Sequence, residues 1–445
     1  MIRKKLVTVV IYLLNIISKF GIICNLPIVV SIIWYILLRP YKRIKYRKKT
    51  KNVIVLEKSF GIEDFISAFE SETSYIKFFY LPRTSIKQVY YFFLGKHNLH
   101  ENKYNFPNSS SILNDKKKCE IFYIKTISHL KKIFNFEGFI SFNFKYLTER
   151  EFQKSVIKNN LKFLSCHKEC LFTDHDIYAY DKLLRKGIGK YDGSEISVYN
   201  KIMKKLLLKN STVSKNKLHL IGMPRADKLL NLRKKKLTKE FFLTLLIDES
   251  KGFQNLDVVE NKNSNKFVNK KWSNLSYDTI ECVLDVAKKY KDKVFVFKTK
   301  VTGEPDTLKQ VEFLKEKMPD NCKLISSGSG INLIKKASAV LGFNTTGIIE
   351  SSILNKTTIV PLLNIDLKKF KKNILKIEPK LFYYPKNKKK LREMIVKSVN
   401  NKLPAKKYNP KNNDYVDYYI GNIDGKSGEK LRKVIYGLFL NKKKI

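Results

Sequence analysis

The residues best suited to acid–base chemistry are His167 and Glu169. The chain has only six histidines, and the near-neutral pKa of an imidazole suits the removal of a proton from an acceptor hydroxyl. Glu169 could orient His167 or act as the base itself, and a hydrogen-bonded structural pair is the alternative. We predict His167 and Glu169 as the catalytic residues.

Two segments rich in glycine and hydroxyl residues have the composition of phosphate-binding loops. Ser329 and Gly330 lie in a small-residue loop between a predicted strand and a predicted helix. Asn344, Thr345 and Thr346 follow another predicted strand, where they could hold phosphate oxygens or simply cap a helix. We predict that both segments bind the phosphates of a nucleotide-activated donor.

Two basic residues stand where they could neutralise a phosphate. Arg225 follows the tight turn at residues 222–224, and its guanidinium could pair with a phosphate or with Asp227. Lys298 ends an apolar segment in the second half of the chain. No metal site is predicted, because Cys166 and Cys170 lack a second ligand cluster at suitable spacing.

Short apolar segments alternate with longer helical segments, as in parallel α/β sheets. The predicted strands are residues 52–56, 121–124, 138–141, 218–221, 242–247, 293–297, 322–325 and 339–342. A lysine-rich stretch at 229–240 separates the two halves. We predict an α/β fold with two Rossmann-like domains, residues 52–228 and 229–445, and a ligand cleft at the carboxyl ends of their strands.

The charge balance limits the classes of partner. The chain carries 88 Lys and Arg against 40 Asp and Glu, a formal net charge of +48, which favours anionic lipid, phosphorylated substrates or nucleic acid. No helix-turn-helix, zinc finger or RNP-type aromatic motif accompanies the charge, so specific nucleic-acid binding is disfavoured. The six cysteines form no disulfide framework.

The N-terminal segment 1–51 is predicted to attach the protein to a membrane. Residues 20–38 are uncharged and approach the roughly 20 residues that span a bilayer. A basic cluster at 39–51 follows, which would keep the remaining chain at the cytoplasmic face. A single span and a shallow hairpin both fit, and a buried core helix is the alternative.

Residues 337–352, Ala-Ser-Ala-Val-Leu-Gly-Phe-Asn-Thr-Thr-Gly-Ile-Ile-Glu-Ser-Ser, resemble the donor-site signature of GT-B transferases. The resemblance implies that Glu350 accepts hydrogen bonds from the donor's ribose. Residues 222–227 are similar to the Gly-x-Pro-Arg-x-Asp element of CDP-glycerol glycerophosphotransferase-like and capsular polysaccharide transferase-like proteins. Residues 295–300 occupy the place of those families' Lys-Pro-His-Pro segment without its proline and histidine, and residues 164–169 resemble the His-Lys-Glu stretch of surface-carbohydrate biosynthesis proteins.

The resemblance covers about residues 120–365 and implies a glycosyltransferase or glycerophosphotransferase. Such an enzyme moves a sugar or glycerol-phosphate unit from a nucleotide-activated donor to a lipid-linked or cell-surface polysaccharide acceptor. We expect residues 52–228 on the acceptor side and residues 229–445 to bind the donor nucleotide, with no cofactor besides the donor. A non-catalytic membrane-bound protein of polysaccharide assembly is the alternative.

Overall fold

The computed structural model describes residues 2–57, 59–99, 104, 109–233, 235, 237–247, 262–299, 305–409, 414–421 and 423–440. The chain forms two compact units. Unit 1 comprises Met1–Cys170, Tyr180–Asp227 and Ile420–Ile445, and unit 2 comprises Leu171–Ala179 and Lys228–Tyr419. The N-terminal segment and the C-terminal end of the chain therefore both belong to unit 1, although the sequence predicted a separate segment 1–51 and placed residues 420–445 in the second domain.

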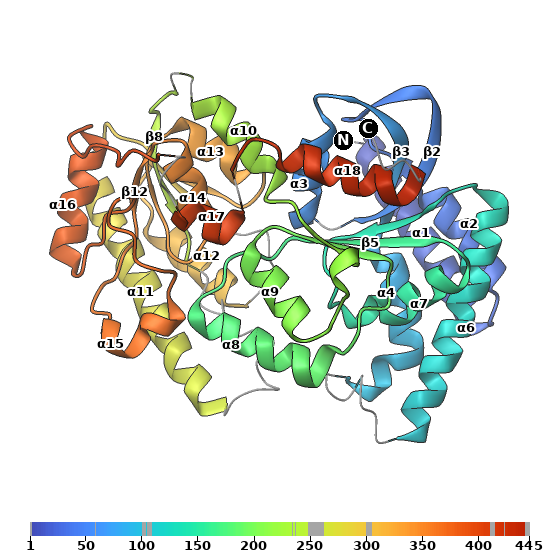
Figure 1. Cartoon of the computed structure of the whole chain (residues 1–445). Coiled ribbons are helices and arrows are strands. Elements are labelled where there is room, and N and C mark those ends of the chain that lie inside the picture. Colours follow the sequence, from blue (N-terminus) through green and yellow to red (C-terminus); the bar gives the residue numbers. More distant parts are fainter. Residues whose placement is uncertain are drawn as a thin grey trace. The chain divides into compact units, whose positions relative to one another are not determined.

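The sheet of unit 1 has seven strands in the described residues (Figure 1). They are β1 (Arg39–Pro40), β2 (Lys45–Glu57), β3 (Thr73–Pro82), β4 (Gly138–Ser141), β5 (Lys162–His167), β6 (Glu195–Val198) and β7 (Leu218–Leu220). The order is β1-β3-β2-β4-β5-β6-β7, with every pair parallel except β1 with β3. β2 is buried on both faces, as its fully buried Val53, Ile54 and Val55 show.

Helices cover both faces of this sheet. Those of unit 1 are α1 (Ile2–Ile23), α2 (Pro27–Leu37), α3 (Ser59–Phe69), α4 (Arg83–Leu94), α6 (Ser110–Ile133), α7 (Arg150–Lys158), α9 (Lys201–Lys209) and α18 (Ser427–Leu440). α8 (Asp174–Leu183) and α10 (Pro224–Arg233) each begin in one unit and end in the other. α18, from the end of the chain, packs against α3.

The apolar N-terminal segment is a helical hairpin. α1 and α2 pack against each other across a turn in which Asn25 has a positive φ of 54°. Trp34 of α2 is fully buried, with its ring 6.0 Å from Phe152 and 6.5 Å from Tyr123. The chain therefore turns within residues 20–38, and the inner face of α2 completes the core of unit 1.

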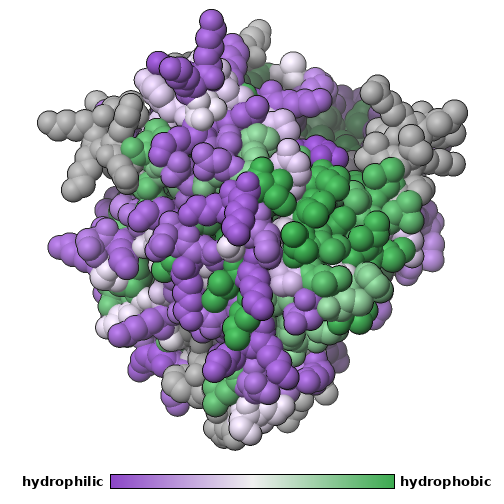
Figure 2. Space-filling view, turned by 90° about the vertical axis from the view of Figure 1, so that its right-hand side faces the viewer, coloured by the Kyte–Doolittle hydropathy of each residue, from purple (hydrophilic) through white to green (hydrophobic). Residues whose placement is uncertain are grey.

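Within the described part of the chain, no helix is long and apolar enough to cross a membrane. The outward-facing side chains of the hairpin are nevertheless apolar and exposed, among them Tyr12, Phe20 and Ile23 at 66%, 59% and 65% exposure. Figure 2 shows a continuous apolar patch on one face of the protein surface.

The sheet of unit 2 is wholly parallel, with five strands in the order β10-β9-β8-β11-β12. They are β8 (Phe241–Leu245), β9 (Phe295–Lys298), β10 (Cys322–Ile325), β11 (Ala337–Leu341) and β12 (Thr357–Ile359). The helices are α11 (Lys262–Lys289), α12 (Pro305–Lys317), α13 (Gly330–Lys336), α14 (Thr346–Ile353), α15 (Leu367–Phe370), α16 (Lys388–Val399) and most of α17 (Asp414–Ile420). This is the Rossmann order, in which winding reverses between β8 and β11.

The predicted α/β class with two Rossmann-like sheets is confirmed. Most predicted strands coincide with observed ones, and residues 138–141 and 322–325 match β4 and β10 end to end. The strand predicted at 121–124 is wrong, because these residues lie inside α6. Phe122 and Tyr123 of that run are buried and Ile121 is exposed, as expected on a helix that packs against α7.

Candidate functional site

In unit 1 the candidate residues gather at the carboxyl ends of β4 and β5. The two strands are neighbours, with Ser141 paired to Ser165, so the segments that follow them leave the sheet at the same edge. β5 ends at His167, and Lys168 and Glu169 follow directly. The segment after β4 contributes Lys145, whose charge acts on both His167 and Glu169.

His167 is fully buried, and neither ring nitrogen has a hydrogen-bond partner among the described residues. Its ring lies edge-on to Phe144, with centroids 4.8 Å apart. Burial lowers the pKa of His167 to about 3, an effect opposed by Glu169 and reinforced by Lys145 and Lys168. The near-neutral pKa expected from the sequence is therefore wrong for the ligand-free protein, because an apolar enclosure penalises the imidazolium.

Glu169 is paired with its neighbour Lys168 at 2.8 Å and not hydrogen-bonded to His167. Burial alone would raise the pKa of Glu169, but the charges of Lys168, His167 and Lys145 outweigh it and lower the pKa to about 2. Its side chain retains 41% exposure. The alternative interpretation, a hydrogen-bonded His167–Glu169 pair, is therefore wrong. Glu169 is an ionised carboxylate that forms an ion pair with Lys168.

Residues after β4 complete this edge and were not singled out from the sequence. The buried Asn143 accepts a hydrogen bond from the backbone N–H of Lys145 at 3.0 Å, which fixes the turn. Arg83 lies 3.7 Å from the centre of the Tyr146 ring and pairs with the buried Glu149. The signal for Asn143 and Lys145 was present, because these polar residues lie in the segment that follows the predicted strand 138–141.

Arg225 is held by a partner far away in the sequence. Its Nη1 donates to Oδ2 of Asp64 in α3 at 2.6 Å, and Asp64 is 2% exposed. Burial, together with the charge of Asp64, raises the pKa of the adjacent Tyr199 well above its ordinary value. The alternative pair of Arg225 with Asp227 is wrong, since Arg225 is directed to Asp64.

Asp227 instead binds the beginning of α18. Its carboxylate accepts hydrogen bonds from the backbone N–H groups of Ser427 at 3.2 Å and Gly428 at 2.8 Å. Gly222 has a φ of 77°, and a Cβ added at Gly421 would lie 2.7 Å from the Gly222 Cα. The Gly-x-Pro-Arg-x-Asp element therefore fastens the C-terminal helix to unit 1.

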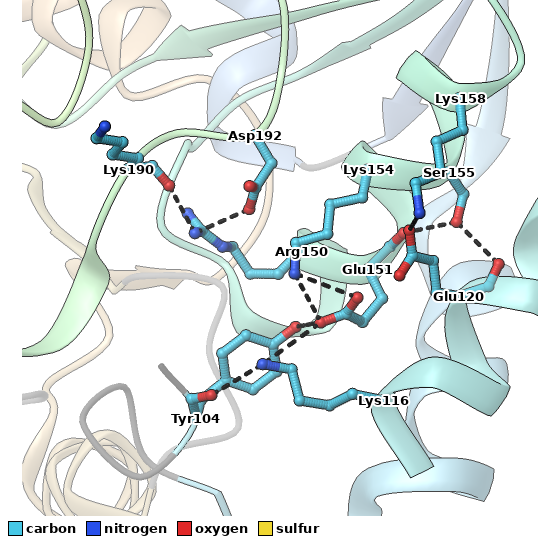
Figure 3. A network of polar contacts seen from close by, with 10 residues as sticks. All are labelled: Tyr104, Lys116, Glu120, Arg150, Glu151, Lys154, Ser155, Lys158, Lys190 and Asp192. Carbon is cyan, nitrogen blue, oxygen red and sulfur yellow. Dashed lines mark hydrogen bonds and ion pairs between the residues drawn. The ribbon is translucent and has the colours of Figure 1, made fainter. Parts of the chain in front are cut away.

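A second polar network in unit 1, around α7, is structural (Figure 3). Arg150 donates to the carbonyl of Lys190 at 2.7 Å and pairs with Asp192 at 2.9 Å. Glu151 accepts a hydrogen bond from the hydroxyl of Tyr104 at 2.5 Å and pairs with Lys154 at 3.2 Å. These contacts hold α7 in place, although Nε and Nη1 of Arg150 have no hydrogen-bond partner among the described residues.

In unit 2 the donor candidates lie at the edge where winding reverses. Leu341, the last residue of β11, is paired with Thr244 of β8, and Lys298, the last residue of β9, with Leu245. α14 begins five residues after β11 ends, and a Cβ added at its Gly347 would overlap the Leu245 side chain. The N-terminus of α14 is thus pressed against the end of β8, where Rossmann-like sheets bind phosphates.

The polar side chains that open α14 also stabilise the local structure. Asn344 has a φ of 45°, donates to the carbonyl of Asn373 at 3.0 Å and accepts from the N–H of Leu375 at 3.1 Å. Thr345 caps the helix through the N–H of Gly347 at 3.5 Å. Thr346 is partly exposed. Asn344 and Thr345 therefore have structural partners, whereas Thr346 is partly exposed at the start of the helix.

The remaining donor candidates share this edge. The Lys298 Nζ donates to the carbonyl of Thr299 at 2.6 Å, and burial lowers its pKa. Ser329 precedes α13, a helix that packs against α14, and a Cβ added at Gly330 meets no atom within 4 Å. Glu350 lies one turn into α14 and is 5% exposed. The structure therefore brings all predicted donor residues of unit 2 to the carboxyl edge of one sheet.

Acidic residues and cysteines near β5 do not gather into a ligand cluster. Asp176 accepts hydrogen bonds from the N–H and the hydroxyl of Thr173 at 2.8 and 2.7 Å, which caps α8. Burial raises the pKa of the Cys166 thiol to about 12. Across the described ranges, no group of three or more His, Cys, Asp or Glu side chains is arranged to hold a metal ion.

No protein-family model and no curated protein match the chain. Among solved structures, it is similar to the UDP-GlcNAc 2-epimerase of Methanocaldococcus jannaschii, with 16% identity and a TM-score of 0.47 over 87% of this chain and 99% of that one. It is also similar to a putative UDP-N-acetylglucosamine 2-epimerase of Listeria monocytogenes, with 12% identity and a TM-score of 0.47 over 88% of this chain and 98% of that one. The similarity to the wall teichoic acid polymerase TagF has 10% identity and a TM-score of 0.42 over 97% of this chain and 98% of that one.

Proposed function

We propose that the protein is a GT-B-type transferase that moves a sugar or glycerol-phosphate unit from a nucleotide-activated donor to a lipid-linked or polysaccharide acceptor. The observation that carries the proposal is the edge of unit 2, where the N-terminus of α14 abuts the end of β8 at the reversal of strand order. Helix N-termini at this position suit the phosphates of a nucleotide.

The chemistry of the unit 2 edge fits a nucleoside diphosphate derivative. Backbone N–H groups near Thr346 bind phosphate oxygens, and Lys298 from the neighbouring strand adds positive charge. Glu350 accepts hydrogen bonds from ribose hydroxyls, as acidic residues do in dinucleotide sites. The open space around Gly330 admits a ligand next to the backbone.

The chemistry of the unit 1 edge fits activation of an acceptor hydroxyl. In transfer from CDP-glycerol, the hydroxyl oxygen attacks the phosphorus that bears glycerol, the bond to the CMP oxygen breaks, and CMP leaves. The hydroxyl proton passes to a ring nitrogen of His167, which is neutral and has no hydrogen-bond partner among the described residues. Lys145 and Lys168 supply positive charge for an anionic substrate.

One observation favours the non-catalytic alternative, a binding protein of polysaccharide assembly. A pKa of about 3 makes His167 a weak base, and catalytic bases work best with pKa values near the operating pH. A bound phosphate next to the ring would raise that pKa. Turnover with a donor and an acceptor therefore decides between the two functions.

The donor site is tested by thermal unfolding of the full-length protein with CDP-glycerol and with UDP-, GDP- and CMP-sugars. A selective donor at 100 times its Kd stabilises the protein by about 2.7 kcal/mol. Glu350→Gln and Lys298→Met are expected to lose this stabilisation, because each removes a polar donor contact while keeping side-chain volume. No stabilisation by any donor would reject the proposed function.

Matched controls come from the same unit. Glu316 on α12 and Lys323 on β10 are exposed and lie outside the proposed site. Glu316→Gln and Lys323→Met should keep the full donor response. Loss of the response in these controls as well would show that the effect is one of general charge and not of the α14 edge.

A further inference from the structure

The outer face of the α1–α2 hairpin is an apolar surface without a partner in the described chain. More than half of the exposed large hydrophobic side chains of the described residues lie in this hairpin. We call them the hairpin face: Val10, Ile11, Tyr12, Leu13, Ile16, Ile17, Phe20, Ile23, Leu26, Ile28, Ile32, Tyr35 and Ile36. Apolar surface of this extent on a monomer marks an interaction site.

Neighbouring helices extend the hairpin face. The side-chain amide of Gln88 in α4 donates to that of Asn15 in α1 at 3.1 Å, so the two helices lie side by side. Tyr91 and Phe92 of α4 are 56% and 47% exposed and add aromatic area. Figure 2, which views the side of the protein on which Figure 1 labels α1 and α2, shows a large apolar patch.

The hairpin is fastened along the body of unit 1. The inner face of α2 buries Val30, Ile33 and Trp34 in the core, and α1 packs against α2 and α4. Withdrawing α2 to cross a bilayer would empty that core. A partner must therefore meet the hairpin face from outside, with both helices lying flat on the surface of the unit.

The charges around the hairpin face are basic. Residues 10–38 and α4 contain no acidic residue, and Lys19 is exposed. The acids of α6, Asp115 and Glu120, are paired with lysines at 2.9 and 2.6 Å. The exposed charged side chains of α6 are all lysines: Lys117, Lys118, Lys125, Lys131 and Lys132.

α6 lies beside the hairpin, because it packs against α2 and its neighbour Phe134 has its ring 6.0 Å from that of Tyr35. The helix that carries these exposed lysines therefore lies beside the apolar area. A second copy of the chain would bring the same lysines face to face and be repelled. An anionic lipid surface offers apolar depth for the hairpin and negative headgroups for the lysines.

We propose that the hairpin face docks on a bilayer that contains anionic phospholipid, with α1 and α2 in the plane of the interface. The aromatic rings of Tyr12, Tyr35 and Tyr91 lie at the level of the headgroups. The docking rests on the hairpin face alone and uses no residue of the proposed catalytic or donor site, so it does not depend on the proposed transferase activity.

Flotation of the full-length protein with lipid vesicles tests the proposal. Vesicles of phosphatidylcholine with phosphatidylglycerol should bind the protein at least about tenfold more tightly than phosphatidylcholine alone, and added salt should weaken binding. Ile16→Glu and Phe20→Glu should each lower the affinity about tenfold. Leu308→Glu and Ile377→Glu, at exposed apolar positions of unit 2, should leave it unchanged.

A second readout keeps the test independent of whether the charged variants fold. Cys24 at the hairpin turn is exposed, whereas the other five cysteines are buried, so an environment-sensitive fluorophore attaches selectively to Cys24. Its emission should shift to the blue with anionic vesicles. An unshifted spectrum, or a shift caused by self-association in light scattering without lipid, would overturn the proposal, since the face would then have no lipid partner or would meet a second copy.

Discussion

The carboxyl edges of the two sheets differ in how they present polar groups. At β4 and β5 of unit 1 the groups are side chains: the buried ring of His167 lies under the electrostatic influence of Lys145, Lys168 and Glu169. At β8 and β11 of unit 2 they are largely backbone N–H groups and hydroxyls at the start of α14, close-packed on Leu245.

The difference separates two kinds of chemistry. A titratable side chain such as that of His167 can gain or lose a proton, as proton transfer requires. The backbone N–H groups at a helix N-terminus bind anions without gaining or losing a proton. Substitutions at the unit 1 edge should therefore change the transfer rate and its pH dependence. Substitutions at the unit 2 edge should change the local packing and the affinity for the donor. Substitutions at each edge can contradict this division between proton transfer in unit 1 and anion binding in unit 2, and the largest effect is expected at His167.

His167→Gln should reduce the transfer rate by at least about 100-fold, because the proton acceptor is lost. The thermal stabilisation by the donor should persist, since the donor edge lies in unit 2. The matched control is His219→Gln, at a histidine paired with Glu195 at 2.8 Å, which should change the rate less than about twofold. Equal loss of donor stabilisation in His167→Gln would break the division between the units.

Arg225→Met should destabilise the protein by about 3 kcal/mol, because it leaves the buried Asp64 carboxylate without its cation. Denaturant unfolding measures the loss. The double variant with Asp64→Asn should recover part of it, since the uncompensated charge is then gone. A normal stability with impaired donor binding would instead return Arg225 to a phosphate-binding role.

The stability of the native protein should fall as pH decreases from 7 to 5. The folded pKa of His167, about 3, lies below its unfolded value of about 6.5. The unfolded chain thus takes up the proton first, and the stabilising contribution, full above pH 6.5, is lost as pH falls toward 3. Between pH 7 and pH 5 the loss is about 2 kcal/mol.

His167→Gln should remove that part of the pH dependence. Urea unfolding of both proteins at pH 7 and pH 5 gives the difference. The lowered pKa of Glu169, about 2, keeps its carboxylate ionised over this range. Parallel pH profiles for the two proteins would show that the ring is already solvated.

Gly347→Ala should have the smallest effect, about 1 kcal/mol of destabilisation, because the added methyl group meets the flexible Leu245 side chain. Donor affinity should fall with it as the start of α14 moves. Gly330→Ala, where the methyl group meets no neighbour within 4 Å, should leave the unfolding temperature unchanged or slightly higher. Opposite results for the two glycines would contradict the close packing of the α14 edge.

Several features could be predicted from the sequence because they depend on a few adjacent residues. The strands at 138–141 and 322–325 stand out as short apolar runs between turns, and the polar residues after the strand at 339–342 led to Thr346. His167 was singled out as one of only six histidines and by the resemblance of residues 164–169 to a His-Lys-Glu stretch. The prediction of a strand at 121–124 is wrong for the same reason, because a short apolar run within a helix has the same pattern as a buried strand. β5 was missed because all of its residues after Lys162 are buried, so that no alternation of buried and exposed positions marks the strand.

The sequence by itself determined the α/β class, the positions of most strands and the apolar character of the N-terminal hairpin. Only the tertiary structure decided which face of that hairpin enters the core, because both faces are apolar and no polar stripe marks the outside. It also decided the partner of Arg225, 161 residues away in Asp64, and the pKa of His167. Pairing and burial depend on residues brought together by folding, and local patterns carry no record of them.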